Sequence, residues 1–332
     1  MELIHADASM HELGVLDFER FDGVTARKAD LDSNDWEVRI PAEDFARVGV
    51  APGHFLYFPG TEWGGEVEKI RHESRTRTVH ISGVGWRGML VRRVVTPPAG
   101  QTHLDLRETE LSAAMTALLG DGLGGLFQVA TTGTGLTAGL RFRYPVLLDA
   151  LNELLDAHDR RLVLSLDSDS GRVLLDAQPV VDHSEDVELS GDYDLSYTAT
   201  RGVAQYKHVI ALGGGEQADR IVRHLYLLPD GSVTDDASAD GVATGRGERV
   251  LLYDYANSED ETELLRGAKK RLLEYAAQNT IEFRFDSPDI DLPLGDRVGL
   301  RDRLTGMADV RAIVRKLLTV SADGVQLQYE VE

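Results

Sequence analysis

The stretch from Ile281 to Val331 constrains the fold more than any other part of the sequence, because it opens and closes with strict alternation of apolar and polar residues. Residues 281–286 and 325–331 both alternate, and a period of two places one set of side chains on each face of a strand. Turn residues separate further apolar runs between them, and Asp323-Gly324 is typical of a tight hairpin. The pattern predicts strand, turn, strand, turn, strand, hairpin and strand.

The N-terminal part, residues 1–98, is also predicted to be β. Residues 36–40 alternate in the same way, and glycine pairs such as Gly64-Gly65 mark turns. We expect residues 86–95 to form the last strand of this part. Pro97-Pro98 then supplies a boundary, since two prolines give no hydrogen-bond donors to a sheet.

Residues 99–178 change to helical spacing. Apolar residues recur at intervals of three and four from Leu111 to Leu119 and again from Leu147 to Leu155. We expect helices at about 109–119 and 145–157, followed by a hairpin around the turn at 167–171. This part is predicted to be a small α/β domain.

Residues 179–332 return to β with one long helix, expected at 259–278. Ser258 and Glu261 have the spacing of a capping box, in which a serine caps the backbone and a glutamate three residues later bonds back. The predicted fold class is therefore a β-rich α+β protein. It has two barrel-like tube domains, at 1–98 and 179–332, and a small α/β domain between them.

Composition excludes several kinds of function. The chain has no cysteine, which excludes disulfides, thiolate metal sites and thiol catalysis. It has 56 acidic against 35 basic residues, a net charge of −21, and nucleic-acid affinity comes mostly from lysine and arginine. The sequence has no run of about 18 apolar residues, and its N-terminus does not resemble a secretory signal. We expect neither a DNA-gripping surface nor membrane insertion.

Two glycine motifs match a dinucleotide-binding fingerprint, G-x-G-x-x-A. The first follows the apolar run 209–212, but the next apolar run ends at Pro229-Asp230-Gly231 and leaves too little chain for a crossover helix. Glycines in a bent strand or a loop explain both matches. The two sets are Gly213, Gly215 and Ala218, and Gly133, Gly135 and Ala138.

Other candidate sites are also better explained as turns. Asp167, Asp169 and Gly171 resemble the start of a calcium loop, but Gln178 stands where the bidentate glutamate is needed. Asp182-His183-Ser184 has the residue types of a catalytic triad, but adjacency in sequence does not produce triad geometry.

Asp286, Asp289 and Asp291 could gather two carboxylates for glycan hydrolysis, although the prolines around them favour an exposed turn. We therefore expect no catalytic residue, no cofactor-binding residue and no metal ligand, and no enzyme activity.

Four short patterns, taken together, resemble the tail-tip hub proteins of siphophages, which are related in fold to the baseplate hubs of contractile phages. The resemblance covers most of the chain and rests on the order of the patterns. They are Trp36–Pro41 with Pro52–Leu56 and Gly64–Val67; Gly83–Arg93 with Val94–Pro97; Val209–Gly215 leading to Arg220; and Leu294–Val298 with Asp323-Gly324.

The resemblance implies a virion structural protein at the tail tip, made in the host cytoplasm. Such hubs form a homotrimeric ring of two barrel domains per chain, which joins a hexameric tail tube to a threefold tip. Implied partners are the distal tail protein, the tail tube, the tape-measure protein and tip or receptor-binding proteins. DNA passes through during ejection without being bound specifically.

Many proteins of the resembled family carry a long C-terminal extension, whereas the last predicted strand here ends at Val331, directly before Glu332. The resemblance therefore implies no receptor-binding or lytic role of its own for this chain. Two alternatives stay open at this point. They are a carbohydrate-binding β module and a carboxylate-based glycan hydrolase of a tail tip. The net charge further suggests that a ring of such chains has an acidic or neutral lumen, although acids that face outward for solubility fit it equally well.

Overall fold

The computed structural model describes most of the chain. It leaves out residues 31, 33, 186–187, 191–195, 202–203, 216–218, 257–259, 277–278, 287–291, 303 and 305. The backbone alone is described for residues 188–190, 196–201, 276, 279–286, 300 and 307.

The chain forms two compact units, each described by itself. The first comprises Met1–Tyr197, Glu282–Asp302 and Ala308–Glu332, and the second comprises Thr198–Ile281 and Arg303–Met307. Strands dominate both units, which confirms the β-rich α+β class. The predicted division at residues 98 and 178 stays a prediction, and the main sheet described next includes strands from both of the predicted barrel domains.

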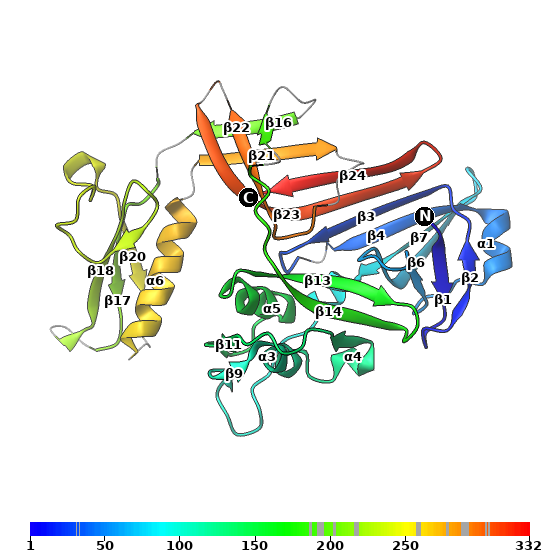
Figure 1. Cartoon of the computed structure of the whole chain (residues 1–332), viewed down its shortest axis with the longest axis horizontal. Coiled ribbons are helices and arrows are strands. Elements are labelled where there is room, and N and C mark those ends of the chain that lie inside the picture. The colour runs from blue at the N-terminus through cyan, green and yellow to red at the C-terminus, as the bar shows by residue number, and fades with distance from the viewer. Residues whose placement is uncertain are drawn as a thin grey trace. The chain divides into compact units, whose positions relative to one another are not determined.

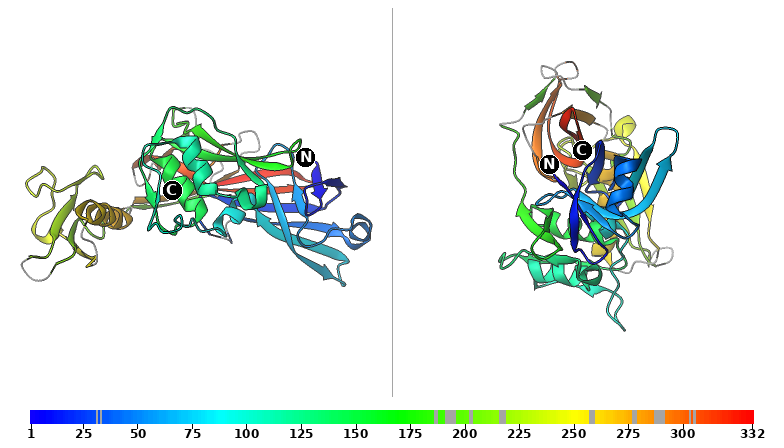
Figure 2. Two further views of the ribbon diagram at one scale, coloured as in Figure 1. Left: turned by 90° about the horizontal axis from the view of Figure 1, so that it is seen from below. Right: turned by 90° about the vertical axis from the view of Figure 1, so that its right-hand side faces the viewer.

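The largest sheet has 13 strands and holds most of the first unit together (Figures 1 and 2). Its main path runs β16-β21-β24-β23-β3-β4-β7-β6-β5-β1-β2, and β22 pairs with both β23 and β15. The bounds are β1 Leu3–Ala6, β2 Glu12–Leu16, β3 Arg20–Ala26, β4 Asp35–Pro41, β5 Phe55–Tyr57, β6 Gly64–Glu73, β7 Thr78–Gly85, β15 Glu188–Ser190, β16 Ser196–Arg201, β21 Asn279–Asp286, β22 Arg297–Asp302, β23 Met307–Ser321 and β24 Gly324–Val331.

The C-terminal strands occur where the alternation predicts them. Ser321 and Gly324 pair across the two loop residues Ala322 and Asp323, so the hairpin between β23 and β24 is confirmed, with Gly324 as the first residue of β24. On its other side β23 pairs antiparallel with β3, from Arg315 opposite Ala26 to Ser321 opposite Arg20. This pairing joins N-terminal and C-terminal strands of the chain within one sheet (Figure 1).

The α/β part of the first unit packs two helices against a three-stranded sheet of order β10-β14-β13. Both helices lie where helical spacing predicts them, and the predicted hairpin at 167–171 is the β13–β14 connection. The elements are β8 Leu104–Asp105, β9 Thr109–Glu110, α3 Leu111–Leu119, α4 Gly122–Gly125, β10 Phe127–Val129, β11 Thr137–Ala138, β12 Arg141–Phe142, α5 Leu147–Asp156, β13 Arg160–Asp167 and β14 Arg172–Pro179.

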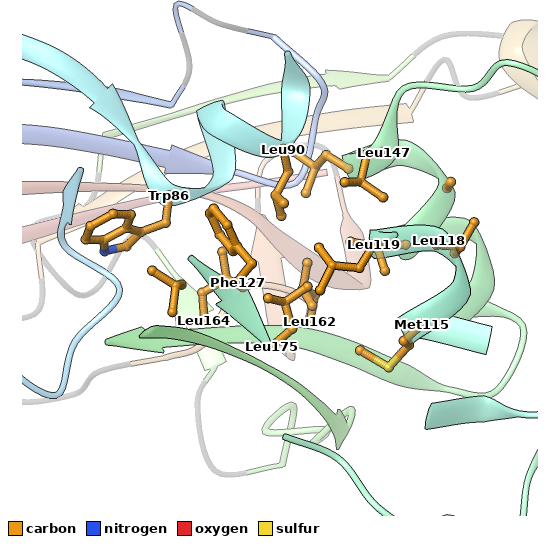
Figure 3. Packing of buried hydrophobic residues seen from close by; sticks show 14 of the residues in the cluster. Trp86, Leu90, Met115, Leu118, Leu119, Phe127, Leu147, Leu162, Leu164 and Leu175 are labelled. Carbon is orange, nitrogen blue, oxygen red and sulfur yellow. The ribbon is translucent and has the colours of Figure 1, made fainter. Parts of the chain in front are cut away.

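One apolar core joins this α/β part to the N-terminal strands (Figure 3). Trp86 and Leu90 project from the N-terminal part toward Phe127 and Leu164 of the α/β part, and all four side chains are buried. Burying one such side chain contributes about 1.5–3 kcal/mol. The α/β part is therefore attached to the sheet by shared packing.

Two short helices in the N-terminal part differ from the sequence prediction. Residues 86–95 were expected to form a strand, but α2 spans Trp86–Val91. Trp86 and Leu90 are four residues apart and both buried, which is helical spacing that a short apolar run hides. The other helix, α1, spans Ala42–Val48 and ends at Gly49, whose φ of 65° is a left-handed cap.

The second unit packs one long helix on a four-stranded sheet of order β19-β18-β17-β20 (Figure 1). Leu264, Ala268 and Leu272 of the helix are fully buried against Val209 and Ala211 of the sheet. The elements are β17 His208–Leu212, β18 Val222–Leu227, β19 Val233–Thr234, a 3-10 turn Gly245–Gly247, β20 Val250–Asp254 and α6 Glu261–Ala276.

Helix α6 confirms the long helix but not the capping box. Asp260 caps the helix, since its carboxylate accepts hydrogen bonds from the backbone N–H groups of Thr262 and Glu263 at 2.8 and 3.3 Å. Glu261 instead forms an ion pair with Arg223 at 2.6 Å. Ser258 lies outside the described residues. Aspartate is as good a cap as serine, so the spacing alone did not distinguish between them.

Candidate channel and assembly surface

The main sheet presents one half-exposed polar face that extends across β24, β23, β3, β4, β7 and β6. On β3, β4 and β7 the opposite face is mainly apolar and buried, and Phe21, Val38 and Ile81 are fully buried there. Register brings polar residues of adjacent strands together, as when Asp22 lies opposite Glu37 and Glu37 lies opposite Ser82. Alternation thus produces a continuous polar surface.

Hydrogen bonds and ion pairs fix the charged side chains of this face. Arg20 donates to Asp22 at 2.6 Å, and the hydroxyl of Thr319 donates to the same carboxylate at 2.8 Å. Glu37 lies 3.2 Å from Arg39 and 3.0 Å from His80. Most of these charged side chains therefore pair within one strand, and His80 with Glu37 and Arg315 with Glu330 pair between strands.

These contacts keep the carboxylates ionised. Partial burial raises the pKa of Glu37, but hydrogen bonds from His80 and Arg39 outweigh burial and lower the pKa below its ordinary value. The pKa of Asp22 is lowered in the same way, with burial opposed by Arg20 and Thr319.

Acidic and basic residues on this face are close to balanced. The acidic residues on it include Asp22, Glu37, Glu73 and Glu330, and the basic residues include Arg20, Arg39, Lys69, Arg71 and Arg315. The face is thus mixed in charge rather than strongly acidic.

Beneath the sheet, Glu62 joins two buried cations. Its carboxylate lies 3.3 Å from Nε of Arg87 and 3.3 Å from Nζ of Lys316. The side chains of Glu62, Arg87 and Lys316 are 13, 3 and 3% exposed. Arg87 also donates to the backbone carbonyl of Leu162 at 2.7 Å. These contacts connect a loop, a helix and two sheets within the first unit.

A cavity of about 300 Å³ lies beside this cluster. Its walls are apolar where β13 and β24 contribute Leu164 and Leu327, and charged where Glu62, Arg87 and Lys316 approach.

A second buried cluster forms around Asp296, which is 1% exposed. Arg161 lies 2.8 Å from its carboxylate, the backbone N–H of Val181 donates to it at 2.8 Å, and His183 lies 3.3 Å away. Asp296 belongs to the Leu294–Val298 pattern, and its contacts show that this pattern connects the C-terminal strands to the α/β part.

The glycine motifs do not form a dinucleotide site in the described residues. Strand β18 returns antiparallel beside β17, and the connection is closed by hydrogen bonds between Gly213 and Ile221 and between Ile221 and Gly214. Ala218 lies outside the described residues. In the other motif, Thr134 between Gly133 and Gly135 donates to Glu110, which caps α3, and Ala138 lies in β11.

Asp167 and Asp182 each accept hydrogen bonds from the residues that closely follow them. Asp167 accepts hydrogen bonds from Asp169 and Ser170 within the hairpin, close to Gly171. Asp182 accepts from the backbone of Ser184, whereas His183 contacts Asp296, so these neighbours form no triad.

The proposed carboxylate pair is not tested by the structure. Asp286 ends β21, and Asp289 and Asp291 lie outside the described residues. Elsewhere, the described part of the chain contains no group of three or more histidine, aspartate or glutamate side chains that could hold a metal ion. Among the helices that are described, none has the length and apolar character needed to cross a membrane.

Sequence reasoning missed the Glu62 cluster. Its members are 25 and 254 residues apart, so no local spacing could reveal it. The only local signal is a single charged residue, Glu62, directly before Trp63 and two glycines.

Comparison with known proteins supports one fold over the whole chain. No protein-family model matches the sequence, and no curated protein sequence matches it. Solved structures do match. The 43 kDa tail protein of prophage MuSo2 from Shewanella oneidensis has a TM-score of 0.61 at 12% identity, covering 100% of this chain and 98% of that one.

Two further tail proteins match over similar lengths. A tail protein from Neisseria meningitidis has a TM-score of 0.57 at 14% identity, covering 99% of this chain and 95% of that one. Prophage tail protein gp18 from Listeria monocytogenes has a TM-score of 0.57 at 13% identity, covering 99% and 94%. The chain therefore has the fold of phage tail proteins, as the resemblance of its motifs implied.

Proposed function

We propose that this chain is a structural protein of a phage tail, and that copies of it form a ring at the tail tip through which DNA passes. The observation that carries the proposal is the match to three tail proteins over 99–100% of this chain. The ring is a homotrimer that joins the tail tube to the tip. Its other partners are the distal tail protein, the tape-measure protein and tip proteins, and the chain has no catalytic role.

The polar sheet face is the surface that we assign to the channel. Its fixed ion pairs leave few cations to neutralise phosphates, and DNA carries roughly one negative charge per 1.7 Å of its axis. A near-neutral wall with paired charges gives little counterion release, so DNA can slide along it.

Strand β2 supplies a surface for contact between copies. It is the last strand in the order of the main sheet, and its side chains Leu13 and Val15 are 55% and 53% exposed. A free strand edge with apolar side chains is a template for pairing with another chain. A ring requires each copy to meet two neighbours, and an exposed edge can continue the sheet into one of them.

Replacing both Leu13 and Val15 by lysine is expected to weaken self-association at least tenfold, because the edge becomes charged and polar. Native mass spectrometry at rising concentration measures this, with a trimer expected for the unchanged chain, alone or once docked on tail-tube protein. Val94→Lys is the control, since Val94 is 51% exposed in the same unit. A stable dimer with twofold symmetry, or trimers unaffected by the double change, would contradict the assignment.

Adding lysines to the polar face is expected to slow DNA release from particles that carry this chain. Glu73→Lys with Gln328→Lys adds cations on two strands without touching the buried clusters. Each lysine that contacts a phosphate should steepen the slope of the logarithm of DNA affinity against the logarithm of salt concentration by about 0.9. The control is Glu263→Lys, on the exposed side of α6. Unchanged release from intact tails would show that this face does not line the channel.

A further inference from the structure

In the second unit, two histidine side chains lie within hydrogen-bond distance of each other. Nε2 of His208 lies 2.9 Å from Nδ1 of His224, and the two rings are stacked with centroids 5.1 Å apart. The residues lie on paired antiparallel strands, where His208 is opposite Tyr226 and His224 is opposite Ile210. The two imidazoles are therefore diagonal neighbours on the face of the sheet that α6 does not cover.

His208 is held in one orientation by its surroundings. Its other ring nitrogen, Nδ1, lies 2.9 Å from the carboxylate of Glu248, and its ring stacks on Tyr226 at 4.5 Å. When Nδ1–H donates to Glu248, Nε2 carries a lone pair directed at His224. A carboxylate on the far nitrogen is the arrangement that orients metal-bound histidines and raises their basicity.

Access and spacing favour a metal ion at this point. His208 is 6% exposed, whereas His224 is exposed, so an ion between them is reached from solvent on one side. Zinc–nitrogen bonds of about 2.0–2.1 Å at a tetrahedral angle separate two ring nitrogens by about 3.3 Å. The observed distance of 2.9 Å between the two ring nitrogens then has to increase by only a few tenths of an ångström.

We propose that His208 and His224 form a two-histidine site for a divalent transition metal such as Zn²⁺ or Cu²⁺. The ion takes the place of the proton between the two rings, and His224, bound through Nδ1, then carries its proton on Nε2, which is exposed to solvent. Glu248 fixes the His208 tautomer, and water completes the coordination. The bound ion joins β17 to β18 on the open face of the second unit. The site is independent of the proposed tail function.

Titration of the full chain with Cu²⁺ and with Zn²⁺ tests the site by isothermal calorimetry. One equivalent is expected to bind in each case. His224→Gln should weaken binding at least tenfold, since it removes one of two ligands from an exposed position. Glu248→Gln should weaken it roughly tenfold through the orientation of His208 alone.

The matched control is the other histidine pair of the chain. Nε2 of His5 lies 2.8 Å from Nδ1 of His54 in the first unit, with the same ring separation of 5.1 Å, but His54 is half-buried whereas His224 is exposed. His54→Gln should leave the affinity unchanged. In the Cu²⁺ electron paramagnetic resonance spectrum, two imidazole nitrogens are expected for the unchanged chain and one for His224→Gln. Equal affinity in His224→Gln and the unchanged chain, or no binding at all, would overturn the proposal.

Discussion

Replacing Glu62 by glutamine is expected to lower the free energy of unfolding of the first unit by about 3–5 kcal/mol. Glutamine keeps the shape but removes the carboxylate that lies 3.3 Å from Nε of Arg87, whose side chain is 3% exposed. A buried cation that loses its counterion cannot recover the hydration it gave up on folding. Urea denaturation followed by tryptophan fluorescence measures the loss, because all three tryptophans lie in the first unit.

An exposed ion pair provides the control for this experiment. Glu68 and Arg92 are 40% and 41% exposed, and breaking such a pair typically costs about 0–1 kcal/mol. Glu68→Gln should therefore move the urea midpoint far less than Glu62→Gln does. Similar midpoints for the two variants would mean that the Glu62 cluster contributes no more than a surface pair.

The same cluster predicts the sign of a pH effect. Burial raises the pKa of Glu62, but Lys316 and Arg87 outweigh burial and hold the pKa below its ordinary value of 4.5. A carboxyl group with a lowered folded pKa stabilises the protein above its unfolded pKa, and this contribution is lost as the pH falls. The unchanged chain should lose this contribution progressively below about pH 4.5, and Glu62→Gln should lack that part of the acid dependence.

The second large effect is expected from Gly83→Ala, which should lower the free energy of unfolding by about 3 kcal/mol. A Cβ atom at Gly83 would lie 1.9 Å from the carbonyl oxygen of Glu66 on β6 and 2.7 Å from the ring of Trp36. Strands β6 and β7 already carry a register shift beside this point, between Val67 and Lys69. Backbone atoms cannot rotate away as a side chain can, so the strands would have to separate.

Gly139→Ala is the matched control, since a Cβ atom there has nothing within 4 Å and its φ is not in the left-handed region. The urea midpoint of Gly139→Ala should stay close to that of the unchanged chain. If Gly83→Ala behaves in the same way, the close approach of β6 and β7 relaxes at little cost.

Regular periodicity made the strands and long helices predictable. The alternation in residues 325–331 predicted β24, and the leucine spacing in residues 147–155 predicted α5, because each pattern reflects burial of one face. Helix α2 was missed, since six residues with one buried tryptophan give too short a pattern to separate a helix from a strand. Asp260 was passed over in favour of Ser258 because both residues can cap a helix.

The surface and the clusters could not be predicted in the same way. Pairing β3 with β23 brings Asp22 to Thr319, residues that are 297 positions apart in sequence. Such pairs depend on which strands become neighbours, and strand alternation is equally consistent with many orders. The four short patterns nevertheless implied a fold that the comparisons support, because their order along the chain follows the topology.

Arg87 has a further consequence for the behaviour of the chain at high concentration. Strand β13 is the last strand of its sheet, yet the Leu162 carbonyl on its free edge accepts a hydrogen bond from Arg87, and the Leu166 N–H donates to the Thr61 carbonyl. Two of the groups that could recruit a foreign strand are thus already occupied. The residue that neutralises Glu62 therefore also occupies one position on an edge that could otherwise pair with a foreign strand.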